Sequence, residues 1–110
     1  MQVLFRTRDP EGSRLRDQVE RRVRFVLRRL GWKVPRAEVQ LSDLNGPRGG
    51  SDKRCQLELK TEGRGRVVVS SVAKDWRTAL DEALARAVRT VLRKLKRALP
   101  ARVPHAARLP

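Results

Sequence analysis

Residues 41–60, LSDLNGPRGGSDKRCQLELK, hold two strand-like stretches joined by a long turn, and this combination decides the fold. In the second stretch, Cys55, Leu57 and Leu59 alternate with polar residues. Such alternation is typical of a strand whose sheet packs on a core with one face and meets water with the other. The turn formers Asn-Gly-Pro and Gly-Gly lie between the two stretches and predict a long hairpin connection.

The four residues Gly46 to Gly49, GPRG, also fit the GxxG pattern with which KH domains clamp RNA backbones. A KH loop joins two helices, whereas this one joins two predicted strands. A Walker-type phosphate loop needs Gly-Lys-Ser/Thr at the start of a helix, which is absent here. We therefore interpret GPRG as a structural turn, with contact of Arg48 or Lys53 to a backbone phosphate as the minor alternative.

Strand and helix patterns extend on both sides of this hairpin. The expected strands cover residues 2–8, 36–44, 53–60 and 66–72, and the expected helices cover 13–30 and 75–97. Ser13 and Asp75 are the expected N-caps, because short polar side chains satisfy the free amides at a helix start. Gly31 is expected to end the first helix in the left-handed conformation, with Trp32 folded back on its last turn.

The order β-α-β-β-β-α predicts an α+β fold with two layers, in which two helices cover one face of a largely antiparallel four-stranded sheet. Each helix has an apolar stripe that we expect to be buried. The two stripes are Leu15, Val19, Val23, Val26, Leu27 and Leu30, and Trp76, Leu80, Ala83, Leu84, Ala87, Val88, Val91, Leu92 and Leu95. Residues 1–97 are thus one domain, and 98–110, with three prolines, are interpreted as a disordered basic tail.

Composition narrows the class of partner. The chain has 110 residues and a formal net charge of +15, from 27 Lys and Arg against 12 Asp and Glu. Such an imbalance indicates a polyanionic partner, with nucleic acid ahead of an anionic membrane surface. No apolar run approaches the roughly 20 residues that span a bilayer, and the N-terminus lacks signal-peptide features. We therefore expect a cytoplasmic protein with no membrane association.

The charge is concentrated on the predicted helices. Residues 13–30 hold seven Arg and two acids, and residues 75–97 hold seven Arg or Lys and three acids. Residues 36–72 are nearly balanced, with seven bases and five acids. The alternative is an ordinary solvated helix surface with pairs such as Asp17–Arg21 and Glu20–Arg24. We favour polyanion binding, and the candidate RNA-binding residues are Arg21, Arg24, Arg28, Arg86, Arg89, Arg93, Lys96 and Arg97.

The sequence gives no support for catalysis or for a cofactor. His105, the only histidine, lies in the expected tail, so neither a catalytic triad nor a histidine metal site is predicted. Cys55, the only cysteine, is expected to point inward. Trp76 is expected in the core and Phe25 on the outer, arginine-rich face. The strands lack the exposed aromatics of an RRM domain, and a double-stranded RNA-binding domain lacks the leading strand.

Two stretches resemble the ribosome hibernation-promoting factor family, also called ribosome-associated inhibitor or sigma-54 modulation proteins. They are DLNGPRGGSDKRCQLEL at 43–59 and KDWRTALDEALARAVRTVLRKLKR at 74–97, and the likeness covers about residues 2–97. The resemblance implies a translation-regulating stress factor that binds small-subunit rRNA in the mRNA and tRNA channel. Arg86, Arg89, Arg93 and Lys96 match the family's basic positions, and Arg21, Arg24 and Arg28 correspond more loosely.

The resemblance implies that the domain blocks translation by occlusion and makes or breaks no bond. Long members of the family append a second domain that pairs ribosomes, and no such domain is expected after Pro100. We expect a monomer away from the ribosome, with no small-molecule substrate. Two alternatives stay open: a structured-RNA binder outside the ribosome, and a regulator whose basic face meets an acidic protein.

Overall fold

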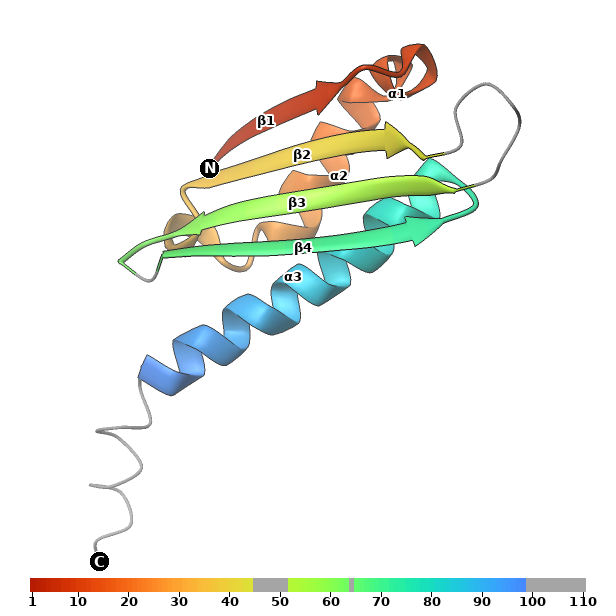
Figure 1. Cartoon of the computed structure of the whole chain (residues 1–110). Coiled ribbons are helices and arrows are strands. Elements are labelled where there is room, and N and C mark those ends of the chain that lie inside the picture. The colour runs from red at the N-terminus through yellow and green to blue at the C-terminus, as the bar shows by residue number, and fades with distance from the viewer. Residues whose placement is uncertain (45–51, 64, 99–110) are drawn as a thin grey trace, which may run out of the picture.

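The structure is a computed structural model that describes residues 1–44, 52–63 and 65–98 (Figure 1). Its strands are β1 (Gln2–Thr7), β2 (Arg36–Asp43), β3 (Lys53–Thr61) and β4 (Gly65–Ala73). They form one sheet in the order β1-β2-β3-β4, with β1 parallel to β2 and the other neighbours antiparallel. The largely antiparallel sheet and the α+β fold class are confirmed.

The helical layer covers one face of this sheet (Figure 1). It consists of α1 (Pro10–Arg14), α2 (Arg16–Leu27), the short 3-10 helix η1 (Gly31–Lys33) and α3 (Trp76–Ala98). Both α2 and α3 start from the end of the sheet where β1 and β4 end, so they run back in the same general direction (Figure 1). Their C-terminal turns, which carry many of the bases, therefore point toward the same end of the molecule.

A single core lies between the sheet and the helices. The inward residues of the strands are buried as the alternation predicts, including Phe5, Val39, Cys55, Leu57 and Leu59. The helices contribute their apolar stripes, with Val23, Leu27, Ala83, Leu84, Ala87 and Val91 almost inaccessible to solvent. Leu92 is an exception to the predicted stripe, because its side chain is 51% exposed. It lies in the C-terminal part of α3.

The first helical segment starts earlier than predicted. Asp9 is the N-cap of α1: its Oδ1 accepts hydrogen bonds from the amides of Glu11 (2.8 Å) and Gly12 (3.3 Å). Ser13 lies inside α1 and caps nothing, so that expectation was wrong. Pro10 at the first turn explains the early start, because its fixed φ suits a helix and its missing amide needs no partner. The helix then breaks at Leu15, and α2 follows.

The end of the first helix is also corrected. α2 ends at Leu27, three residues before the predicted end, and a turn leads into η1. Gly31 has φ +49, so its left-handed conformation is confirmed. Trp32 does not fold back on the helix: its side chain is 73% exposed. Since Gly31 opens a 3-10 turn instead of closing the α-helix, the chain turns before the indole can reach α2.

The second long helix begins as predicted. Asp75 Oδ1 accepts from the amide of Thr78 at 2.8 Å, and this bond lowers the pKa of the Asp75 carboxyl. GPRG at 46–49 and the tail at 99–110 lie outside the described residues. In the part of the chain that is described, no helix is both long and apolar enough to cross a membrane.

Candidate nucleic-acid interface

The predicted binding residues all lie on the two long helices, in two groups. Arg21 and Arg24 belong to α2 and Arg28 is its C-cap, while Arg86, Arg89, Arg93 and Lys96 belong to α3; all seven are exposed. Arg97 is part of α3, but its side chain is not among those described. The helical layer therefore presents cations from both α2 and α3.

Three of these arginines are tethered to backbone carbonyls. Arg24 Nη1 donates to the carbonyl of Met1 at 2.7 Å, and Arg28 Nη1 donates to that of Phe25 at 2.6 Å. Arg86 Nη1 donates to the carbonyl of Ser70, on strand β4, at 2.7 Å. A carbonyl does not neutralise a guanidinium, so each keeps its charge and several free N–H donors.

Four cations have no such tether. No hydrogen bond or ion pair joins the side chain of Arg21, Arg89, Arg93 or Lys96 to another described residue. Exposed cations without an acidic neighbour repel one another until an anion screens them. These four are the side chains best placed to bind phosphates without first breaking a contact.

Among the described residues, the acids of the helical layer form no ion pair with the predicted binding residues. Asp81 Oδ1 pairs with Arg22 Nε at 3.1 Å and so links α3 to α2. Glu82 Oε1 accepts from Ser71 Oγ at 2.6 Å. The i,i+4 pairs that the solvated-surface alternative offered, Asp17–Arg21 and Glu20–Arg24, do not form between these described residues. The alternative of a self-neutralised helix surface therefore lacks these two ion pairs, and Arg22–Asp81 is the pair that forms between described residues of α2 and α3.

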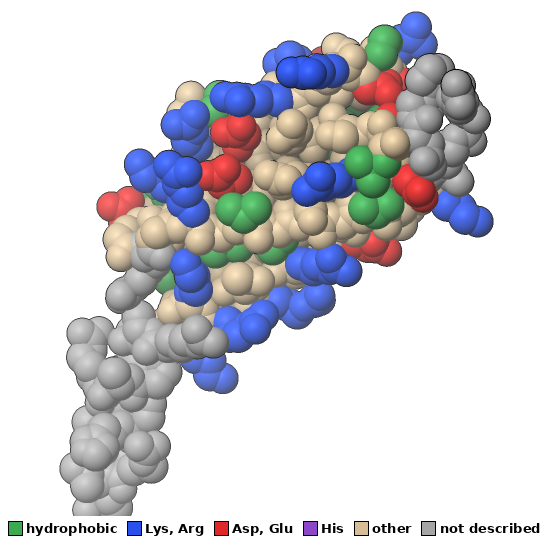
Figure 2. Space-filling model, in the orientation of Figure 1, with side chains coloured by type: hydrophobic (Ala, Val, Ile, Leu, Met, Phe, Trp, Pro, Cys, Tyr) green, Lys and Arg blue, Asp and Glu red, His purple; other side chains and the backbone are tan. Residues whose placement is uncertain are grey.

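The uncovered face of the sheet is different in charge. Figure 2 shows acidic and basic side chains interspersed on it. Arg6 Nε pairs with Glu38 at 3.1 Å, and Arg66 Nη1 pairs with Glu58 at 2.8 Å. Phe5 is buried under this sheet, so the face lacks the stacking platform of an RRM. The predicted helices carry the larger excess of positive charge, +5 over residues 13–30 and +4 over residues 75–97.

A groove runs between α2 and the N-terminal part of α3. It is lined by Leu15, Gln18, Val19, Arg21, Arg22, Phe25, Trp76, Arg77 and Leu80. Phe25 is 55% exposed, as expected, whereas Trp76 is only 6% exposed and belongs to the core. Arg22 and Arg77 were not among the predicted binding residues. Arg22 follows the predicted site residue Arg21, and Arg77 follows the predicted core residue Trp76. The helical spacing that picked out Arg21 and Trp76 therefore did not pick out their neighbours.

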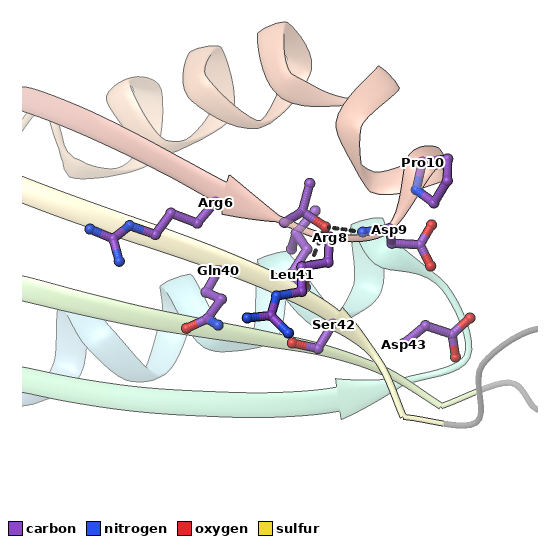
Figure 3. Close-up of a pocket in the computed structure, with 9 residues that line it drawn as sticks. Arg6, Arg8, Asp9, Pro10, Gln40, Leu41, Ser42 and Asp43 are labelled. Atoms are coloured by element: carbon purple, nitrogen blue, oxygen red, sulfur yellow. Dashed lines mark hydrogen bonds between the residues drawn. The ribbon is translucent and has the colours of Figure 1, made fainter.

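A second hollow lies where β1 and β2 end, and residues 6–10 and 40–43 line it (Figure 3). Its polar groups are mostly satisfied internally. Thr7 Oγ1 donates to the carbonyl of Leu41 at 3.0 Å and accepts from the amide of Asp9 at 3.1 Å. Asp43 Oδ2 accepts from Lys53 Nζ at 2.7 Å. With charges of both signs, this hollow does not select a polyanion.

Cys55 lies in the core of the sheet. Its side chain is buried, and burial raises the pKa of its thiol to about 12. A thiol held in its neutral form is a poor nucleophile and metal ligand. The described residues contain no group of three or more His, Cys, Asp or Glu that is placed to hold a metal ion.

The fold is a small α+β domain whose helical layer carries exposed cations on α2 and α3. The family described as "Sigma 54 modulation protein / S30EA ribosomal protein" matches residues 11–99. The chain belongs to this family, which indicates a ribosome-associated modulation factor. No curated protein sequence matches the chain significantly.

Two solved structures share the fold. The Protein Y N-terminal domain of Thermus thermophilus is 24% identical, with a TM-score of 0.61, and the match covers 84% of this chain and 93% of that one. A ribosomal subunit interface protein from Coxiella burnetii is 14% identical, with a TM-score of 0.65, and the match covers 87% and 98%. At these identities the likeness establishes the architecture.

Proposed function

We propose that the protein is a hibernation factor that binds small-subunit rRNA in the channel for mRNA and tRNA. One observation carries the proposal: Arg21, Arg89, Arg93 and Lys96 are exposed cations with no acidic partner among the described residues. The names of the two similar structures, Protein Y and a ribosomal subunit interface protein, agree with a ribosomal partner.

The mechanism is occlusion. Guanidinium groups bind phosphate oxygens through paired N–H donors, which fixes orientation as well as adding attraction. The buried core makes the two layers one rigid body, so the bound domain fills space that mRNA and tRNA require. No covalent step is needed, and initiation components release the domain by competition. Ribosome binding places the protein in the cytoplasm.

The test is charge reversal on the helical face. The double substitution Arg89→Glu and Arg93→Glu removes two phosphate contacts and adds two repulsive charges on the exposed side of α3. Arg86 is left unchanged because its side chain donates a hydrogen bond to the carbonyl of Ser70 on β4. We expect cosedimentation with small subunits, and inhibition of translation by added protein, to be lost, with thermal melting little changed.

A matched control lies on the opposite face. Arg36 and Lys60 are paired across β2 and β3 and are both exposed on the sheet face. Their reversal to Glu changes the net charge by the same amount, and we expect it to leave most of the binding intact. Equal loss from both double variants would indicate nonspecific attraction and reject the helical interface.

The same sedimentation experiment separates the two alternatives. A ribosomal factor travels with small subunits from a lysate of stationary cells. A structured-RNA binder from outside the ribosome travels with other RNA, and a regulator of an acidic protein stays near the top of the gradient. Either of these results would reject the proposed function.

A further inference from the structure

Phe25 is a large apolar side chain that the fold does not bury. It is 55% exposed on α2, whose neighbouring surface positions carry arginines. The core is closed without it, because Val19, Val23 and Leu27 are the buried residues of the same helix. Truncating Phe25 therefore removes little packing. Its exposure on the cationic face suggests that the ring contacts a binding partner.

Two guanidinium groups lie near the Phe25 ring, at different distances. The guanidinium carbon of Arg28 lies 4.1 Å from the ring centroid, and Arg28 is held there by its bond to the carbonyl of Phe25. The guanidinium carbon of Arg22 is 5.8 Å away, and Asp81 holds Arg22 by a salt bridge. Arg28 therefore backs the ring closely, while the contact with Arg22 is loose.

The ring also forms part of the wall of the groove between α2 and α3. Arg21 and Arg77 line the same groove, and both are exposed. Aromatic rings in a positively charged groove are the arrangement with which proteins stack unpaired bases while binding the flanking phosphates.

We propose that Phe25 stacks on an unpaired RNA nucleobase held at this groove, with Arg21 and Arg77 on the adjacent phosphates. This inference rests on the proposed function and identifies the kind of RNA element that the helical face recognises. An apolar peptide is a poorer occupant, because it would desolvate Arg21 and Arg77 while pairing neither of them. Stacking is tolerant of sequence, so the site selects single-stranded RNA rather than a particular base.

The test compares two substitutions at one position. Phe25→Leu keeps the apolar bulk and removes the ring, and Phe25→Tyr keeps the ring. Binding is measured on small ribosomal subunits and on a single-stranded RNA of about a dozen nucleotides. We expect Phe25→Leu to weaken both by about 5- to 150-fold, as for the loss of one stacked base, and Phe25→Tyr to retain binding.

Salt dependence distinguishes stacking from charge. Phe25→Leu removes no cation, so affinity should fall while the slope of log K against log salt stays the same. A duplex of the same sequence keeps its bases stacked internally, and its affinity should be unaffected by Phe25→Leu. Val68→Ala, at an exposed valine on the sheet face, is the control for loss of an exposed apolar side chain.

The outcomes separate this inference from the function on which it rests. If Phe25→Leu binds both RNAs normally while the Arg89 and Arg93 reversal abolishes binding, stacking is rejected and the proposed function stands. If Phe25→Leu weakens binding to subunits but not to single-stranded RNA, the ring contacts a ribosomal protein and stacking is again rejected. If the unaltered protein binds neither subunits nor RNA, both proposals fail.

Discussion

At the residue scale, the aromatic side chains show where helical periodicity predicts burial correctly and where it does not. Trp76 falls on the apolar stripe of α3 and is buried; Phe25 falls among arginines and is exposed. Periodicity placed both correctly because each lies inside a regular helix. Trp32 follows the helix end, where no repeat fixes its direction, and its expected packing was wrong.

The buried Trp76 suggests a test of how α1 is fixed to α3. Its Nε1 donates to Glu11 Oε1 at 2.6 Å, which joins residues 65 positions apart in the chain. Glu11→Ala leaves the indole N–H without this acceptor and should lower the free energy of unfolding by about 1 kcal/mol. Glu11→Gln keeps an oxygen at the same place and should recover most of it.

Urea unfolding followed by tryptophan fluorescence measures both Glu11 variants. If the alanine and glutamine variants are equally destabilised, the charge of Glu11, which also lies 4.0 Å from Lys53 Nζ, matters more than the hydrogen bond to Trp76.

At the element scale, the start of the first helix depends on which of two polar residues caps it. The structure assigns Asp9, whose carboxylate binds two amides, and leaves Ser13 without a capping role. Asp9→Ala should therefore cost about 1 kcal/mol of stability, whereas Ser13→Ala should cost less than about 0.5 kcal/mol. Chemical denaturation of the two variants in parallel gives the comparison. A larger loss from Ser13→Ala would restore the sequence-based assignment.

The free edge of β4 is covered by cations from α3. Arg86 Nη1 donates to the carbonyl of Ser70, and Lys94 Nζ donates to that of Arg66 at 3.2 Å. Unpaired carbonyls on an edge strand invite pairing with another chain, and charged side chains over them oppose it. Arg86 thus has a structural role in addition to the RNA contact predicted from its spacing.

Removing the side chains of Arg86 and Lys94 tests whether they keep the β4 edge from pairing with another chain. The unaltered chain is expected to be monomeric at micromolar concentration, and the variant with Arg86→Ala and Lys94→Ala is expected to self-associate. Light scattering reads the mass of each. The variant with Arg89→Ala and Arg93→Ala loses the same charge from the same helix without touching β4, and should stay monomeric. Association of both variants would attribute the effect to charge alone.

At the scale of the whole molecule, charge is divided between the two faces. Residues 13–30 and 75–97 carry net charges of +5 and +4, while residues 36–72 carry only +2. The acids of the sheet face pair with arginines beside them, as Glu38 does with Arg6. If the partner is the proposed rRNA, we expect the larger charge of the helical layer to orient the domain before contact.

This division predicts a steep salt dependence. If the helical face neutralises about six to eight phosphates, log K for small subunits should fall against log salt with a slope of about −4 to −7. Binding titrations across a range of potassium chloride concentrations measure the slope. A slope near zero would indicate a protein or apolar interface and contradict RNA binding.

The sequence by itself determined the four strands, the second long helix, the inner faces of the strands, most of the helix stripes and the excess of positive charge. These follow from periodicity and composition, which are local properties. The alternating run at 53–60 is an example: each side chain's face follows from its neighbours alone. The family likeness at 43–59 and 74–97 agreed with the match over residues 11–99.

Only the tertiary structure decided which cations are available and where a groove lies. Arg86 and Arg89 look alike in the sequence, yet one holds a strand edge and the other has no described partner, because β4 passes beside only one of them. The groove at Phe25 exists because α2 and α3 run side by side, joined by Arg22 and Asp81, which are 59 positions apart. Contacts between distant segments depend on how the helices pack on the sheet, and no local pattern encodes that packing.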